Sequence, residues 1–157
     1  MSGGLIVAVS AILGWAIAQA DPHGPDAATS QPGTGPPGVS FAVVPAKPRF
    51  GPGEPVKAVL RVVNESEDTV RFAFRSGCQA SFEVVRDGRT LFHHRFHVMC
   101  TMALTARELA PGQSVEFPFT WDRVDDEGAP VSRGAYQIVA YLADGNSPRV
   151  AATVELE

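Results

Sequence analysis

Residues 121–142 read WDRVDDEGAPVSRGAYQIVAYL, and this stretch decides the fold of the chain. An apolar strand ends at Trp121-Asp122, an acidic turn follows, and a new strand opens at Gly134 and Tyr136. A turn glycine followed by a tyrosine at the start of a strand is typical of a tyrosine corner, in which the ring packs inward and the hydroxyl holds a nearby backbone group. We therefore take Trp121, Asp122, Gly134 and Tyr136 as the residues that define a β-sandwich.

Upstream of this stretch, apolar and polar residues alternate in short runs. Residues 56–62 place an apolar side chain at every second position, and residues 70–75 repeat this pattern. A period of two is typical of strands that turn one face toward a core. Because the polar residues 64–68 separate the two runs, we expect these strands to pair as a hairpin. The dipeptide Asp87-Gly88 predicts a second hairpin after the run that contains Phe82 and Val84.

Such runs recur with turn residues between them, down to a last apolar row at residues 150–156. No segment has a convincing helical period. The pattern predicts an all-β fold, an immunoglobulin-like antiparallel β-sandwich of about seven to nine strands. We place this domain at residues 39–157.

The first part of the chain differs from the rest in composition. Residues 1–20 carry no charged side chain and end in Ala18-Gln19-Ala20, a pattern that signal peptidase recognises. We expect a signal peptide, or an N-terminal membrane anchor if the segment stays uncleaved. Residues 21–38 are rich in proline and glycine and should form a disordered linker. These features predict an exported protein, periplasmic or secreted, or tethered to the membrane by residues 1–20.

The charge distribution narrows the choice of partner. The formal net charge is −4, and the basic residues are scattered along the chain. The sequence therefore lacks the basic surface typical of nucleic-acid binding and the polybasic run typical of binding to anionic lipid. We expect a protein partner, no nucleic acid, and contact with a membrane only through an uncleaved N-terminal segment.

Cys78 and Cys100 are the only cysteines. In an exported chain such a pair indicates first a disulfide, which would add roughly 3 kcal/mol of stability. Free thiols are one alternative. Another is a copper site, because His93, His97, Met99 and Met102 carry the soft ligands that copper selects. The spacing matches no copper motif that we can name, so we predict no metal and no cofactor, and we keep copper as an alternative.

No catalytic arrangement accompanies the predicted fold. Ser76-Gly77-Cys78 is a serine beside a glycine turn, but neither a nucleophile elbow nor a paired base follows. The acidic residues 122–127 lack the spacing of a calcium loop and indicate a solvated hairpin. We expect no catalytic residues and no enzymatic activity.

An ordered set of short motifs extends over roughly residues 42–156 and resembles one known family. The motifs are Phe74-Arg75-Ser76-Gly77, Ser81-Phe82-Glu83-Val84, Asp87-Gly88, Leu109-Ala110-Pro111-Gly112, Trp121-Asp122, Gly128 and Gly134-Ala135-Tyr136. In this order they resemble the intracellular proteinase inhibitor (BsuPI) family. The resemblance implies a compact β-sandwich that binds a serine protease of the subtilisin class.

The sequence departs from the family pattern at two places. Cys78 stands where the family usually has glutamine, and residues 91–94 replace a tryptophan-arginine pair. The two cysteines would then be an addition suited to an oxidising compartment. A disulfide between them would join two loops, which we predict to be the partner-contact surface; its candidate residues are Ser76, Gly77, Cys78, His97, Val98, Met99, Thr101 and Met102. A third candidate loop is the hairpin at residues 122–132.

These observations predict an exported, protein-binding β-sandwich that inhibits a subtilisin-type serine protease. One alternative is a cell-envelope adhesion or assembly module without affinity for proteases, which would use a strand edge or a loop face. The second is the copper-binding protein described above.

Overall fold

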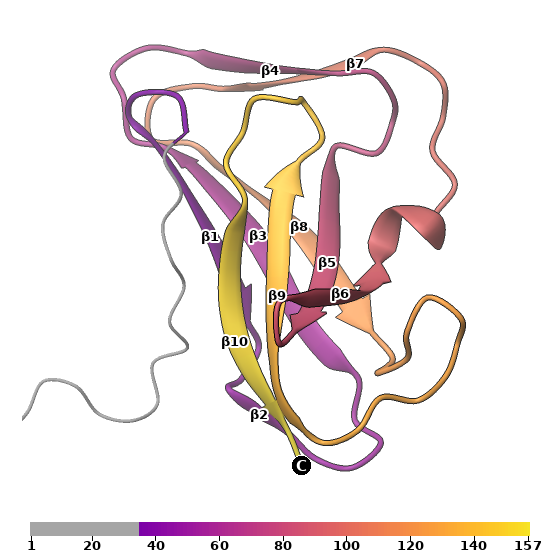
Figure 1. Ribbon diagram of the computed structural model, residues 1–157. Helices are drawn as coiled ribbons and strands as arrows, with labels where there is room; N and C mark the ends of the chain where they lie inside the picture. Colours follow the sequence, from indigo (N-terminus) through magenta and orange to yellow (C-terminus); the bar gives the residue numbers. More distant parts are fainter. Residues whose placement is uncertain (1–34) are drawn as a thin grey trace, which may run out of the picture.

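The computed structural model describes residues 35–157 (Figure 1), so the predicted signal peptide and most of the predicted linker lie outside the described residues. The described part contains ten strands and one short 3-10 helix. The elements are β1 (Val39–Pro45), β2 (Arg49–Phe50), β3 (Val56–Asn64), β4 (Val70–Phe74), β5 (Ala80–Arg86), β6 (Arg89–His93), η1 (His94–Phe96), β7 (Thr105–Leu109), β8 (Ser114–Trp121), β9 (Gly134–Leu142) and β10 (Val150–Leu156).

The strands form two facing sheets and a separate two-stranded ribbon. One sheet has the order β1-β3-β8, the other the order β2-β10-β9-β5-β6, and β4 pairs with β7. Among the described residues every pairing is antiparallel except the short pairing of β2 with β10. Figure 1 shows the β4-β7 ribbon lying across one end of the two larger sheets. The all-β sandwich predicted from the sequence is confirmed.

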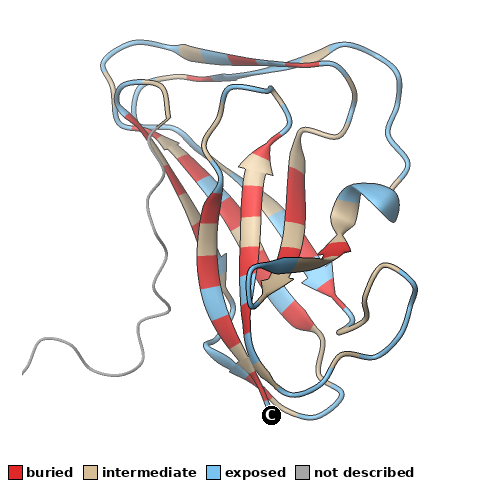
Figure 2. Ribbon diagram, in the orientation of Figure 1, coloured by how far each residue is buried: buried red, intermediate tan, exposed pale blue. Residues whose placement is uncertain are grey.

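The core lies between the two larger sheets. Buried and more exposed residues alternate along β3 and β10, as the period of two requires (Figure 2). Aromatic side chains from both sheets meet in the centre of the core. Phe82 of β5 stacks on Phe119 of β8 with ring centroids 4.5 Å apart, and Phe92 of β6 lies 6.3 Å from Phe119. These aromatic contacts join the two sheets across the sandwich.

The tyrosine at the start of β9, Tyr136, is buried in the same core. The Tyr136 hydroxyl donates to Ser132 O at 2.6 Å and accepts a hydrogen bond from Arg86 Nη1 at 2.9 Å. Gly134 has φ 131°, a backbone conformation that side chains disfavour. The Tyr136 ring lies 5.4 Å from that of Trp121, whose Nε1 donates to Val124 O. This is the geometry of a tyrosine corner, while Asp122 beside Trp121 is exposed.

The hairpin that we expected between residues 56–62 and 70–75 is wrong. β3 pairs on its two edges with β1 and β8, whereas β4 pairs with β7. The physical reason is Asn64, a fully buried side chain whose Nδ2 donates to Asp68 O at 2.7 Å and to Leu109 O at 2.8 Å. Because Leu109 is the last residue of β7, these bonds direct the chain toward the ribbon and away from β3.

We expect Asn64→Asp to lower the free energy of unfolding by about 3 kcal/mol. Aspartate has the same shape but cannot donate to two carbonyl groups, and its charge would be buried. Urea unfolding of the full chain at neutral pH measures the effect.

The matched control is Asn146→Asp, because Asn146 is exposed in the loop between β9 and β10. This control should change the free energy of unfolding by less than about 0.5 kcal/mol. Equal stability of the two variants would contradict the role assigned to Asn64.

Candidate functional site: a pair of cross-linked loops

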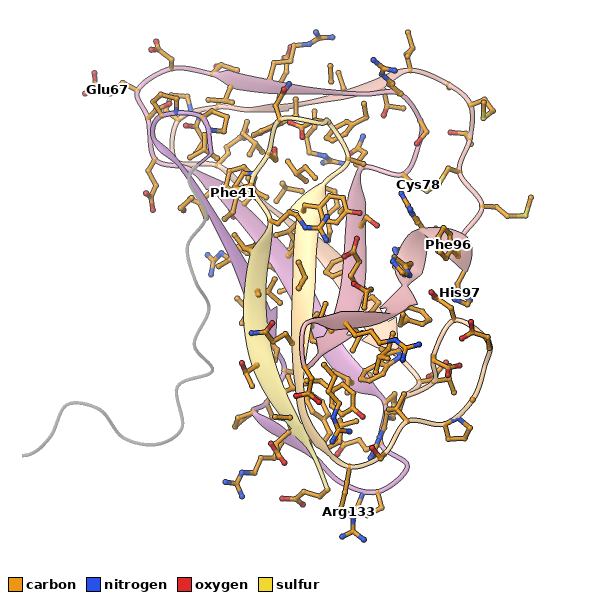
Figure 3. The ribbon with its side chains drawn as sticks, in the orientation of Figure 1. Phe41, Glu67, Cys78, Phe96, His97 and Arg133 are labelled. Atoms are coloured by element: carbon orange, nitrogen blue, oxygen red, sulfur yellow. A yellow bond between two sulfur atoms is a disulfide. The ribbon has the colours of Figure 1, made fainter. Side chains whose placement is uncertain are left out.

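Two loops far apart in the sequence lie side by side near η1. The first connects β4 to β5 and contains Cys78; the second follows η1, leads to β7 and contains Cys100. The two cysteines form a disulfide with a sequence separation of 22 residues. Figure 3 shows Cys78 and Phe96 on the same side of the molecule. The bond brings together the two segments that the sequence marks as candidate contact loops.

Hydrogen bonds reinforce this cross-link. Gly77 N donates to Thr101 O at 3.0 Å, and Thr105 Oγ1 donates to Ser76 O at 2.7 Å. A side chain at position 77 would collide with Thr101 Oγ1, so the close approach of the two loops requires glycine there. Within the first loop, Cys78 N donates to Ser76 Oγ at 3.2 Å. The loops are therefore held together by backbone contacts as well as by the disulfide.

The second loop exposes an unusual amount of apolar side chain. Phe96, Leu104, Met102 and Met99 are 61%, 83%, 93% and 101% exposed, respectively. Val44 is the one other large apolar side chain of the described part with comparable exposure. We call Phe96, Met99, Met102 and Leu104 the apolar patch. Its concentration in the nine residues from Phe96, the last residue of η1, to Leu104 is typical of a protein-contact surface.

The histidines of this region attach the second loop to the core. His94 meets Phe82 and Phe119 edge-on, with ring centroids 5.7 and 5.6 Å away, and His97 stacks on Phe92 at 4.5 Å. Burial lowers the pKa of His94, and the nearby His97 lowers it further. Neutral His94 therefore packs against the core at the start of η1, the element from which the second loop continues.

Asp126 connects the 122–132 loop to the same region. Its carboxylate accepts hydrogen bonds from His93 N at 2.7 Å, from His93 Nδ1 at 2.6 Å and from His97 Nε2 at 3.2 Å. Burial alone would raise the pKa of Asp126, but the hydrogen bonds from the two histidines outweigh it and the pKa lies below its usual value. The third candidate loop is thus bonded through Asp126 to the residues on either side of η1, His93 and His97.

The alternative copper ligands do not converge as a group. His93 and His97 share the Asp126 carboxylate, while Met99 and Met102 extend into solvent. Between residues 35 and 157, no group of three histidine, cysteine, aspartate or glutamate side chains is placed to hold a metal ion. The geometry of these side chains does not support a copper site.

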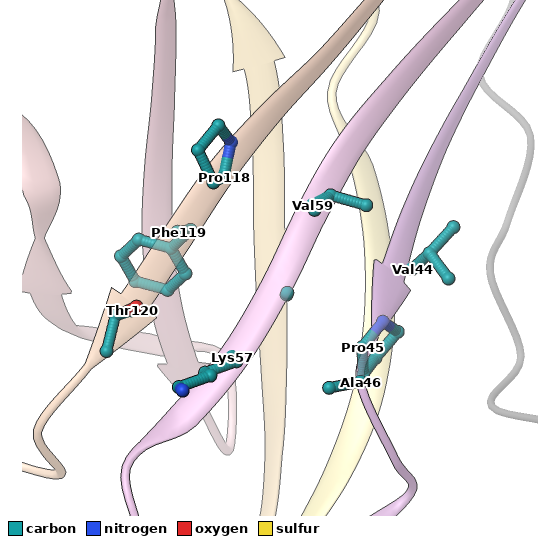
Figure 4. A pocket seen from close by; sticks show the side chains of 9 residues that line it. Val44, Pro45, Ala46, Lys57, Val59, Pro118, Phe119 and Thr120 are labelled. Carbon is teal, nitrogen blue, oxygen red and sulfur yellow. The ribbon is translucent and has the colours of Figure 1, made fainter.

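A hollow of about 450 Å³ lies on the outer face of the β1-β3-β8 sheet (Figure 4). It is lined mainly by apolar side chains, among them Val44, Val59 and Pro118, with Lys57 at its rim. Nothing in the structure shows what would cover this face. The cross-linked loops, in contrast, combine a rigid support with exposed apolar side chains.

The fold and the loops define a class of protein: a β-sandwich that presents a braced, partly apolar loop surface. The family model described as "Intracellular proteinase inhibitor" (BsuPI) matches residues 47–147. The chain therefore belongs to the BsuPI family, as its ordered motifs suggested. No curated protein matches the sequence.

Several solved structures are similar to part of the chain. The β-glucosidase EmGH1 from Erythrobacter marinus is 15% identical with a TM-score of 0.42, and the match covers 76% of this chain and 16% of that one. The alkylpurine DNA glycosylase AlkC from Pseudomonas fluorescens, bound to DNA, is 10% identical with a TM-score of 0.45, covering 76% and 30%. The sporulation control protein Spo0M from Bacillus subtilis is 16% identical with a TM-score of 0.47, covering 76% and 49%. The match thus spans less than half of each of these chains, and we draw no functional argument from them.

The family description corrects our expectation about location. The family is described as intracellular, which overturns the prediction of an exported, periplasmic or secreted protein. That prediction rested on residues 1–20, which lie outside the described residues. Within residues 35–157 no helix is both long enough and apolar enough to cross a membrane.

The Asp126 contacts predict a pH-dependent contribution to stability. Asp126→Asn removes the charge and should lower the free energy of unfolding at pH 7 by about 1 kcal/mol. Because the folded pKa lies below the usual 3.8, the stabilisation is complete above that pH and is lost as the pH falls through the folded pKa. Urea unfolding at pH 7 and at about pH 2.5 should show a difference that shrinks under acid.

Glu127→Gln is the matched control, since Glu127 is exposed in the same loop. It should leave stability nearly unchanged at both pH values. A pH-independent effect of Asp126→Asn would contradict the charge-assisted contacts.

Proposed function

We propose that the chain inhibits serine proteases of the subtilisin class by binding them through the cross-linked loops. Membership of a proteinase inhibitor family supports a protease as partner. The serine class and the contact surface are the specific parts of the proposal. The surface consists of Ser76, Gly77 and Cys78 from the first loop and His97, Val98, Met99, Thr101 and Met102 from the second, and the apolar patch extends it to Phe96 and Leu104.

The observation that carries the proposal is the apolar patch. Exposing four large apolar side chains within one loop leaves a favourable burial energy unused until a partner covers them. Methionine is flexible and polarizable, so Met99 and Met102 suit a surface that must adapt to a partner. Protein interfaces are enriched in methionine and aromatic residues at their centres, and Phe96 adds an aromatic ring.

Rigid support is the second requirement of a tight inhibitor. Ordering a flexible loop on binding costs free energy, and a loop that is already ordered avoids that cost. Here the disulfide, the bond from Gly77 N to Thr101 O and the stacking of His97 on Phe92 hold the loop before any partner arrives. This arrangement supports inhibition through a preorganised surface.

Met99→Ala should raise the inhibition constant of the full chain toward a subtilisin-type protease about tenfold or more, as expected for a side chain at the centre of an interface. A chromogenic peptide substrate reports the residual protease activity. Val44→Ala is the matched control, because Val44 is an exposed apolar residue on β1, in the opposite sheet.

Unchanged protease activity in the presence of the folded wild-type chain would overturn the proposal for this protease class. Equal effects of Met99→Ala and Val44→Ala would overturn the assignment of the surface while leaving inhibition intact.

The double variant Cys78→Ser, Cys100→Ser should lower the free energy of unfolding by roughly 3 kcal/mol. It should also weaken inhibition, because ordering of the loops must then accompany binding. Urea unfolding and the same protease assay measure the two effects. A thiol reductant should make the wild type behave like the double variant and should not affect the double variant itself. Full inhibition by the double variant would show that the disulfide does not brace the surface.

A further inference from the structure

A small pocket lies beside the disulfide and adjoins the apolar patch. Its volume is about 210 Å³, and its walls include Cys78, Cys100, Val98, Ser81 and His94. Arg95, which precedes Phe96 of the apolar patch, also lines it. The pocket is large enough for one side chain or chain end and too small for a folded element.

Two hydrogen-bonding groups in the pocket walls lack partners. Ser81 is 6% exposed, and its Oγ makes no hydrogen bond within the described part of the chain. His94 Nδ1 is likewise buried and makes none among those residues. An unpaired buried polar atom costs free energy, so two that line one pocket indicate that a polar group can be received there.

The chemistry of the walls selects the kind of group. The Ser81 hydroxyl can donate a hydrogen bond, an imidazole with its proton on Nδ1 can donate another, and Arg95 supplies a positive charge. Among the described residues, no carboxylate lines the pocket. The acid closest in sequence to Ser81 on β5 is Glu83, which is already engaged by the Tyr141 hydroxyl and by Arg149. Three groups that can donate, one of them positively charged, and no carboxylate in the lining favour an anion.

We propose that this pocket binds a carboxylate group, received by Ser81 Oγ, His94 and Arg95. This inference rests on the proposed function, because the carboxylate belongs to the protein partner. It is either an acidic side chain of that partner or its chain end. The neighbouring apolar patch then covers the partner's apolar side chains while the carboxylate enters the pocket. Charge-assisted hydrogen bonds from a hydroxyl, an imidazole and a guanidinium offset the cost of burying the anion.

Binding of an anion has a defined effect on His94. A carboxylate at Nδ1 stabilises the imidazolium, so it raises the pKa of His94 and affinity increases as the pH falls through that pKa. Arg95 and Tyr141 line this pocket together with His94, and His97 and Asp122 line a neighbouring pocket that His94 also borders. The ring also packs edge-on against the apolar Phe82 and Phe119.

The test uses the full chain with labelled histidines and three acetylated tripeptides. One is trialanine with a free terminal carboxylate, one is its amide, and one is the amide with glutamate in the middle position. Nuclear magnetic resonance follows the His94 signal during titration with each peptide and with pH. A saturable shift and a higher His94 pKa with a carboxylate peptide, but not with trialanine amide, support the proposal. Tighter binding of one carboxylate peptide identifies the chain end or the acidic side chain as the source.

Variants separate the pocket from the rest of the surface. Ser81→Ala should weaken binding of the carboxylate peptide about tenfold, because a hydrogen bond to a charged group is lost. Arg95→Gln, at an exposed position, should weaken it about twofold to fivefold. Arg133→Gln is the matched control, since Figure 3 places Arg133 at the opposite end of the molecule from Cys78.

Equal responses to the carboxylate and amide peptides, or unchanged binding by both pocket variants, would overturn the proposal. Peptide binding by a chain that inhibits no protease would keep the pocket assignment and overturn the proposed function. Inhibition without any response to a carboxylate peptide would keep the function and overturn the pocket assignment.

Discussion

The structure depends on the aromatic contacts that join the two sheets within the core. Phe82 and Phe119 come from different sheets and stack face to face, with centroids 4.5 Å apart. Their burial removes a large apolar area from water and sets the spacing of β5 and β8. His94 packs against both rings, and His97 packs against the adjacent Phe92. The loop that carries the apolar patch is thus an extension of the core.

This attachment explains how a loop can be both exposed and ordered. Side chains that project into solvent contribute nothing to the stability of their own loop, so the order must come from other residues. Here it comes from the buried histidine rings on one side and from the disulfide and the Gly77 contact on the other. Asp126 adds a third support by holding His93 and His97 in place. The small pocket beside the disulfide is lined by two of these supports, His94 and the disulfide, together with Ser81 of β5.

Local patterns in the sequence were sufficient for the class of fold. Alternation along residues 56–62 and 150–156 reflects one buried face, and that is a property each strand has by itself. The dipeptide Asp87-Gly88 specifies its hairpin because both residues adopt positive φ angles, 51° and 74°. The partners of β3 and β4 could not be predicted from such local patterns. Both strands have acceptable patterns for a hairpin, and the choice depends on the bonds between Asn64 and a residue 45 positions away.

The candidate site shows the same division. The sequence marked the two cysteines, the residues around them and the loop at 97–102, because cysteine pairing and clustered methionines are visible in a single chain. It did not single out Phe96 or Leu104 as exposed, nor His94 as a buried packing group. Exposure and burial of a loop residue depend on which strands lie beneath it, and no short pattern records that. The expectation of export was wrong. It was drawn from the composition of a short N-terminal segment, whereas the family that matches residues 47–147 is described as intracellular.

By itself, therefore, the sequence determined the β-sandwich, its tyrosine corner, the Asp87-Gly88 turn and the family, since each rests on residues that act over a short range or in a set order. Only the tertiary structure decided which strands pair, which apolar side chains remain exposed and which polar atoms share one pocket. These properties depend on how distant parts of the chain come together: Asn64 bonds to Leu109, and Ser81 and His94 line one pocket. Such contacts become defined only when the two sheets close on a common core.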